Sequence, residues 1–145
     1  MIRQLTKADI DKILPIEEAS FSDAWTKTMF KDSFASSYFF GLVWEEEGEI
    51  VGYVCGDAIF EDAQLMSIAT SPNHRKKGIA RGLLAAFEKE CVNRGATVCF
   101  LEVRVSNTPA RTLYERVGYE QIGVRKRYYP DGEDALVMQK TLKEM

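Results

Sequence analysis

The sequence predicts a mixed α/β (α+β) fold, in which a mostly antiparallel central sheet of about seven strands carries helices on both faces. Short segments with alternating or continuous apolar residues are typical of strands. Other segments repeat apolar residues at helical spacing, and the two kinds are interleaved in the order βααβββαβαββ. The 145 residues contain no repeat, low-complexity segment or linker, so we expect a single domain over residues 1–145.

The N-terminal part is predicted as one strand followed by two short helices. After a strand at 1–5, Thr6 and Asp9 have the spacing of a capping box that starts a helix running to about residue 19. The segment SFSDAW at 20–25 is predicted as a loop, and Thr26 caps the second helix.

Three strands and a longer helix are predicted in the middle of the chain. The strands lie at 38–44, 50–59 and 63–70, and the sequence EEEGE between the first two is typical of a hairpin turn. A helix beginning at Gly78 has a single apolar stripe, and Gly95 ends it as a left-handed cap.

The last part is predicted as a strand, a helix and two more strands. The segment TVCFLEV at 97–103 has apolar residues on both faces, which predicts cover on both sides and a central place in the sheet. Ser106 or Asn107 caps the following helix, and strands at 119–127 and 135–141 flank the sequence YYPDGE.

The composition argues against several classes of protein. A net charge of −3 and a pI of about 5.3 argue against a nucleic-acid-binding protein. Three widely spaced cysteines in apolar segments indicate core packing rather than disulfides or a zinc site, and we expect no metal. Because no segment has the length of a membrane span or signal peptide, we expect no membrane association and a cytoplasmic protein.

The segment HRKKGIARGLL at 74–84 predicts an anion site. It joins a strand to a helix whose first-turn amides are unpaired, and these amides together with the helix dipole favour an anion. Gly78 lets the backbone approach the ligand, Gly82 adds room one turn later, and the cations at 75–77 supply charge. The spacing fits neither a P-loop nor a Rossmann motif, so a pyrophosphate held by another arrangement fits best.

Glu102 is a candidate general base. It lies at the carboxyl end of an otherwise apolar strand, where ligands of open α/β sheets bind. A carboxylate there is costly unless it is used or paired. The structural alternative is an ion pair with Arg104 or Arg111.

Tyr114 is a candidate acid. It lies on the apolar face of the next helix, which makes core packing its ordinary role, but its phenol could also reach the strand end that carries Glu102. A carboxylate base and a phenolic acid at one crevice suit a group transfer without net proton change.

These segments together resemble the GNAT N-acetyltransferase superfamily, and more closely its ribosomal-protein-alanine N-acetyltransferase (RimI) family. SPNHRKKGIARGLL resembles the acetyl-CoA motif Arg/Gln-x-x-Gly-x-Gly/Ala, matched by Arg75, Gly78 and Ala80. LEVRVSNTPARTLYERVGYEQIGVRKRYYPDGEDALVM resembles the family pattern LEVR-x-SN-x-x-A-x-x-LY-x-x-x-GF, then R-x-x-YY and EDA-x-x-M. The segment IEEASFSDAWTKTMF resembles the family's substrate loop more loosely, with Ala24 where Pro is usual.

The resemblance implies a role for each matching position. Glu102 would be the general base, acting through water, and Tyr114 the general acid for the departing CoA thiolate. Acetyl-CoA would be held by backbone groups of Ile68, Ala69 and Thr70, by Asn107, and by the pyrophosphate-binding run Arg75, Lys76, Lys77, Gly78, Ile79, Ala80 and Arg81. The peptide groove would be lined by Phe21, Trp25, Tyr128 and Tyr129.

The implied reaction is acetylation of a protein N-terminal amine, in this family the N-terminal alanine of a small-subunit ribosomal protein. An N-terminal amine has a pKa of about 8 and lysine about 10.4, so deprotonating lysine at neutral pH costs roughly 3 kcal/mol more. Acetylation of lysine, a polyamine or another small amine stays open as the alternative. A third hypothesis is RNA binding by Arg75–Lys77 and the segment VRKRYY, with Tyr128 and Tyr129 stacking on bases, and it conflicts with the acidic net charge. We expect a monomer or weak dimer.

Overall fold

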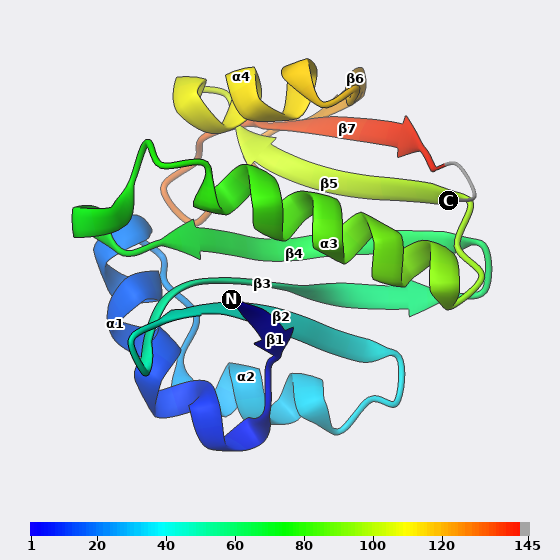
Figure 1. Ribbon diagram of the computed structural model, residues 1–145. Coiled ribbons are helices and arrows are strands. Elements are labelled where there is room, and N and C mark those ends of the chain that lie inside the picture. The colour runs from blue at the N-terminus through cyan, green and yellow to red at the C-terminus, as the bar shows by residue number, and fades with distance from the viewer. Residues whose placement is uncertain (143–145) are drawn as a thin grey trace.

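In a computed structural model that describes residues 1–142, the chain forms one seven-stranded sheet in the order β1-β2-β3-β4-β5-β7-β6 (Figure 1). The strands are β1 (Ile2–Gln4), β2 (Phe39–Glu46), β3 (Glu49–Ile59), β4 (Asp62–Thr70), β5 (Val98–Arg104), β6 (Glu120–Arg125) and β7 (Ala135–Thr141). The helices are α1 (Ile10–Ser20), α2 (Lys27–Phe34), α3 (Ile79–Asn93) and α4 (Thr108–Arg116), with single 3-10 turns at Lys7–Asp9 and Pro72–His74. All neighbouring strands are antiparallel except β4 and β5. The predicted fold class and element order are confirmed.

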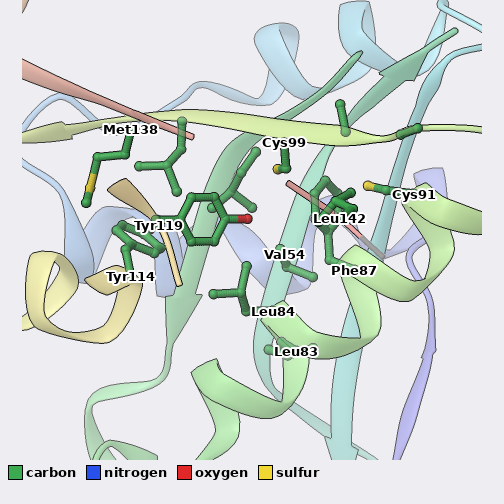
Figure 2. Close-up of a cluster of buried hydrophobic side chains, with 14 of the residues drawn as sticks. Val54, Leu83, Leu84, Phe87, Cys91, Cys99, Tyr114, Tyr119, Met138 and Leu142 are labelled. Atoms are coloured by element: carbon green, nitrogen blue, oxygen red, sulfur yellow. The ribbon is translucent and has the colours of Figure 1, made fainter. Parts of the chain in front are cut away.

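The sheet separates two hydrophobic cores. On one face α3 and α4 pack their apolar stripes, including Leu83 and Phe87, against the strands (Figure 2). On the other face α1 and α2 bury Ile13 and Phe30. Each such side chain contributes about 1.5–3 kcal/mol when fully buried, so both helix layers are fixed to the sheet. The cysteines are buried and free, as expected for core residues.

A β-bulge in β4 changes the direction of that strand. Cys55 pairs with Ser67 and the next residue, Gly56, pairs with Leu65, so Met66 is an extra residue in the ladder with β3. Gly56 permits this close approach, because a Cβ atom there would overlap the backbone of Gln64 and the ring of Phe87. A bulge bends its strand and reverses which face the following side chains point to.

The bend separates β4 from β5. Their parallel pairing covers only Asp62 to Gln64 against Val98 to Phe100 and ends just before the bulge. Figure 1 shows the two strands close together where they begin and well apart at their arrowheads. The backbone of β4 beyond Gln64 therefore faces a gap instead of a partner strand, and this gap lies in the middle of the sheet.

The prediction that β5 is covered on both faces is wrong. Cys99, Leu101 and Val103 are buried, whereas Val98, Phe100 and Glu102 on the opposite face remain half-buried. On that face the main contacts of α1 and α2 are with β2, β3 and β4, and the exposed side of β5 is only partly covered. Within residues 1–142, no helix is long and apolar enough to cross a membrane.

Candidate active site

The N-terminus of α3 has the geometry of an anion site. Gly78 precedes the helix with φ 81°, and a Cβ atom built there would contact nothing within 4 Å. The amides of Ile79, Ala80 and Arg81 have no partner within the helix because they belong to its first turn. Ile79 itself is 3% exposed and holds the helix against the sheet, so only its amide is available to a ligand.

The cations of this segment have different environments. Lys76, Lys77 and Arg81 are exposed, and Lys76 adopts a left-handed backbone with φ 63°. Arg75 folds back instead: its guanidinium donates to the carbonyl of Thr70 and to Ser20 Oγ, both at 3.2 Å. Arg75 therefore joins the start of this loop to the end of α1.

Gly82 does not make room for a ligand, so that prediction is wrong. A Cβ atom at Gly82 would lie 2.8 Å from the indole of Trp44, and this ring already fills the space. The glycine lets α3 approach β2 closely, which is a packing role.

Backbone groups at the end of β4 face the gap. The amide of Ser71 donates to the carbonyl of Val51 at 2.8 Å. This bond identifies which residues of β4 direct their backbone groups towards β3. By alternation, the amide and carbonyl of Ala69 belong to the ladder with β3, whereas those of Ile68 and Thr70 point to the other side. Of the three residues predicted to offer backbone groups, these two therefore face the gap.

Asn107 is the N-cap of α4. Its side-chain oxygen accepts from the amide of Ala110 at 3.3 Å, which satisfies one orphan amide of the first turn. The sequence left Ser106 and Asn107 as alternatives for this cap, and the structure selects Asn107. Its side-chain NH₂ group remains available for another partner.

Glu102 lines an open groove on the uncovered face of β5. The groove is also lined by Phe100, Val137 of β7 and residues 57–64 of the β3–β4 hairpin. Glu102 accepts a hydrogen bond from Gln64 at 3.2 Å and pairs with Arg125 at 3.5 Å. Its side chain is 14% exposed, so the carboxylate is held but remains accessible.

The expected alternative partners of Glu102 are engaged elsewhere. Arg104 pairs with three other carboxylates, and Arg111 donates to the carbonyl of Val105 at 2.8 Å. Glu102 is therefore in an ion pair, as the structural alternative expected, but its partner is Arg125 and not Arg104 or Arg111. Arg125 belongs to the R-x-x-YY motif, so the sequence carried a signal for this partner.

Tyr114 projects into the core on the α3 side of the sheet (Figure 2). Its ring packs against Tyr119 with centroids 5.8 Å apart, and burial raises the pKa of its phenol. Tyr114 belongs to the same core cluster as Leu101 and Val103, whereas Glu102 alternates with these two residues along β5. The two candidate catalytic side chains therefore lie on opposite faces of the sheet.

The residues predicted to line a peptide groove fall into two groups. Tyr128 is exposed beside Glu102, and a hydrogen bond with that carboxylate raises the pKa of Tyr128. Tyr129 is half-buried, and burial raises its pKa to about 12. Phe21 and Trp25 pack partly against the core of α1 and α2, with the Trp25 ring 5.1 Å from that of Phe30. Their rings therefore anchor the loop at 21–26 to this core, and they do not project freely from the loop.

A buried carboxylate that the sequence analysis missed supports this loop. Glu17 is 2% exposed and accepts from the amide of Trp25 and from Ser67 Oγ, both at 2.9 Å, and from the Tyr53 hydroxyl. Its position on the apolar stripe of α1, one residue after Ile16, was the available signal, because a charged residue among core positions needs partners.

The site thus combines an anion-binding helix start after β4, an unpaired edge of β4 and a groove at the β3–β4 hairpin. Glu102 lines this groove two residues beyond Phe100, the last residue of β5 that pairs with β4. Amides and cations can hold a phosphorylated donor, and Glu102 can accept a proton from a group that enters from the groove. Within the described part of the chain, no cluster of three or more His, Cys, Asp or Glu side chains is arranged to hold a metal ion.

Comparison with known proteins agrees with this geometry. Residues 10–119 match the model of the Acetyltransferase (GNAT) family. The [ribosomal protein bS18]-alanine N-acetyltransferase of Haemophilus ducreyi is 33% identical over 142 residues, 95% of this chain and 97% of the relative. A Bacillus subtilis protein provisionally named for the same activity is 39% identical over 146 residues, 99% of this chain and 96% of the relative.

Solved structures show the same fold. The crystal structure of the ribosomal-protein-S18-alanine N-acetyltransferase from Escherichia coli superposes with a TM-score of 0.91 and 28% identity, covering 100% of this chain and 94% of that one. Naa20 of Chaetomium thermophilum, solved with a bisubstrate analogue, gives a TM-score of 0.86 and 25% identity, covering 98% of this chain and 86% of that one. The family model and the relatives, taken with the cationic start of α3 and the gap beside β4, show that the chain belongs to the GNAT family of acetyl-CoA-dependent N-acetyltransferases.

Proposed function

We propose that this protein transfers an acetyl group from acetyl-CoA to the N-terminal amine of a protein, with the N-terminal alanine of ribosomal protein bS18 as the first candidate. The observation that carries the proposal is the position of Glu102, a held but accessible carboxylate in a groove beside the gap between β4 and β5. The bS18-alanine N-acetyltransferases named above, which align with nearly the whole chain, support the choice of substrate.

The start of α3 fits the diphosphate of the donor. Lys76, Lys77 and Arg81 are exposed there, and the free space at Gly78 allows phosphate oxygens to reach the first-turn amides. Ile68 offers its amide and carbonyl to the acetyl and pantetheine portion, and Thr70 offers its amide, since its carbonyl already accepts from Arg75. The side-chain NH₂ group of Asn107 can donate to the same ligand. Acetyl-CoA supplies the acetyl group as a thioester.

The two candidate catalytic groups divide the proton transfers between them. Glu102 removes a proton from the attacking ammonium, directly or through water, so that the nitrogen lone pair can form the new C–N bond. The nitrogen is then cationic, and it releases a second proton to water as the C–S bond breaks, which leaves the neutral amide. Tyr114 gives its proton to the sulfur as the C–S bond breaks, and it recovers one from solvent. Because burial raises the pKa of Tyr114, the phenol holds its proton until the leaving group needs it.

The groove favours an extended peptide end. Its floor is the half-buried face of β5, and Tyr128, on the loop between β6 and β7, contacts Glu102 at its edge. An α-amine suits a single carboxylate base, since its pKa of about 8 is lower than that of lysine. A ribosomal substrate implies that the enzyme acts in the cytoplasm, and the proposal needs no metal or nucleic acid and only a monomer or weak dimer.

A direct assay separates the proposal from its alternative. The purified chain is given acetyl-CoA with a peptide of the bS18 N-terminus that begins with alanine, the same peptide with a blocked N-terminus and an internal lysine, or spermidine. We expect acetylation of the free N-terminus only, located by tandem mass spectrometry. Modification restricted to lysine or spermidine would replace the proposal with the small-amine alternative.

A further inference from the structure

Arg104 connects two loops that are distant in the sequence. Arg104 is the last residue of β5. It lies on the same face of the strand as Glu102, which precedes it by two residues. Its Nη1 donates to Asp131 and Glu133, both at 2.9 Å, and its Nη2 lies 3.1 Å from Asp23. Asp131 and Glu133 belong to the β6–β7 loop (residues 126–134), whereas Asp23 belongs to the α1–α2 loop (residues 21–26).

The contacts of Arg104 extend beyond ion pairs. Its guanidinium carbon lies 4.1 Å from the centroid of the Tyr129 ring, a distance suited to a cation–π contact. Glu133 also accepts from the amide of Ser106 at 2.7 Å, which ties the same loop to the segment that leads into α4. The Arg104 side chain is only 16% exposed, so these contacts are shielded from water more than ordinary surface pairs are.

We propose that Arg104 is a positioning residue for the peptide substrate: it holds the α1–α2 loop and the β6–β7 loop together at the end of β5, two residues beyond Glu102. This inference rests on the proposed function for its substrate, although the structural claim about the two loops does not. Arg104 does not touch the reacting atoms, and it acts through Tyr129 and through the two loops.

The planar fork of arginine is needed for this role. Two different nitrogens bind carboxylates from different loops while the flat face of the guanidinium meets Tyr129. The ammonium of lysine is a single point charge and cannot occupy both positions. Removal of the guanidinium would also leave Asp23, Asp131 and Glu133 as neighbouring negative charges, and their repulsion would push the loops apart.

The test combines steady-state kinetics with hydrogen exchange measured by mass spectrometry on the full chain. In Arg104→Ala we expect faster amide exchange in both loops and a KM for the peptide that rises about tenfold or more, because small displacements of a bound substrate are costly. The KM for acetyl-CoA should stay within about twofold, since the donor site at the start of α3 makes no contact with Arg104. Arg104→Lys should change both readouts in the same direction but less.

One-loop variants and a control arginine complete the design. Asp23→Asn should loosen only the α1–α2 loop, and its effect on the peptide KM should not add to that of Arg104→Ala. Arg94→Ala is the matched control, because Arg94 also pairs with a glutamate, at 2.8 Å, and covers an aromatic ring, at 4.1 Å, but lies at the far end of α3.

The outcomes are distinguishable. Unchanged exchange in either loop of both Arg104 variants, or an unchanged peptide KM in both, overturns the inference. If Arg104→Ala fails to fold, as judged by circular dichroism, Arg104→Lys provides both readouts. If the wild-type chain acetylates no peptide N-terminus, the proposed function fails, and the exchange of the two loops still decides whether Arg104 holds them.

Discussion

The Tyr53 hydroxyl in β3 donates a hydrogen bond to the carboxylate of Glu17 in α1, which lies 36 positions earlier in the chain. Both side chains are buried, and burial beside this anion raises the pKa of Tyr53, so the phenol remains a donor. The same carboxylate binds Ser67 in β4 and the amide of Trp25. One buried anion thereby fixes a helix, two strands and the loop beside the groove.

Replacement of Glu17 by alanine should lower the free energy of unfolding by about 2–4 kcal/mol, because several buried donors lose their acceptor. Urea denaturation followed by circular dichroism measures this change. Glu18→Ala is the matched control, since Glu18 is exposed on the same helix and should change stability by no more than about 0.5 kcal/mol. Equal effects of the two substitutions would show that Glu17 has no special structural role.

Glu102→Gln should lower kcat for the peptide about 10²- to 10³-fold, because the amide cannot accept the proton of the ammonium. The KM for acetyl-CoA should not change, since Glu102 lies outside the diphosphate site. Glu120→Gln on exposed β6 removes a carboxylate away from the groove lining and serves as the control. Full activity of Glu102→Gln would exclude Glu102 as the base.

Tyr114→Phe should lower kcat about 10- to 100-fold with little loss of stability, because the buried ring and its packing against Tyr119 are kept. The neighbouring Tyr119 offers the opposite contrast. Its hydroxyl donates to buried Glu88 at 2.9 Å, so Tyr119→Phe should cost about 1–2 kcal/mol of stability and leave kcat intact. The same effect of both variants on kcat would contradict a special role for Tyr114.

The pH profile provides a second check on Tyr114. Burial raises the pKa of its phenol above the ordinary value of about 10. The phenol should therefore stay protonated through the mildly alkaline range, and kcat should not fall between pH 8 and about 10 through ionisation of this group. A fall in that range that disappears in Tyr114→Phe would show that the phenol ionises early.

Gly78→Ala should destabilise the fold by about 1–2 kcal/mol, because φ 81° is unfavourable for a residue with a Cβ atom. It should also raise the KM for acetyl-CoA, because the methyl group occupies space next to the first-turn amides. Gly123→Ala is the matched control: its Cβ would also meet nothing within 4 Å, but its φ is not in the left-handed region. Identical behaviour of the two variants would exclude a conformational role for Gly78.

The ion pair between Arg3 and Asp9 should make stability depend on acidic pH. Hydrogen bonds from Arg3, at 2.8 and 3.0 Å, lower the pKa of Asp9 from 3.8 to about 2. Because the folded-state pKa is depressed, this stabilisation is complete above the unfolded value of about 3.8 and is lost as the pH falls towards 2. Asp9→Asn should therefore unfold more easily than wild type at pH 7, and the difference should shrink towards pH 2 in denaturant titrations. A difference that is the same at both pH values would assign it to packing.

Local structure followed the sequence closely. Thr26 caps the helix that it was expected to cap, and Asn107, one of the two candidates for the next cap, caps α4. Gly78 adopts the left-handed conformation before α3. Alternation also placed Glu102 on the same face as Phe100. These features depend on hydrogen bonds and steric limits among residues a few positions apart, so they can be predicted from the sequence.

Other features required contacts between distant segments. The strand predicted to begin at residue 119 begins at 120, and β7 inserts between β5 and β6, so Arg125 on β6 reaches Glu102 across β7. Gly82 serves Trp44 of β2 rather than a ligand. Residues that are neighbours in the sequence do not reveal which strands will pair in the sheet.

By itself, the sequence determined the kinds of elements, their order, the cationic helix start and the family motifs around LEVR and YY. Tertiary structure alone decided that β4 bulges at Met66 and leaves β5, that Glu102 and Tyr114 approach β5 from opposite faces, and that Arg104 joins two distant loops. The reason is physical. Caps and turns are fixed by residues a few positions apart. The gap between β4 and β5 and the ion pairs of Arg104 instead depend on contacts between segments that are distant in the sequence and meet only when the chain folds.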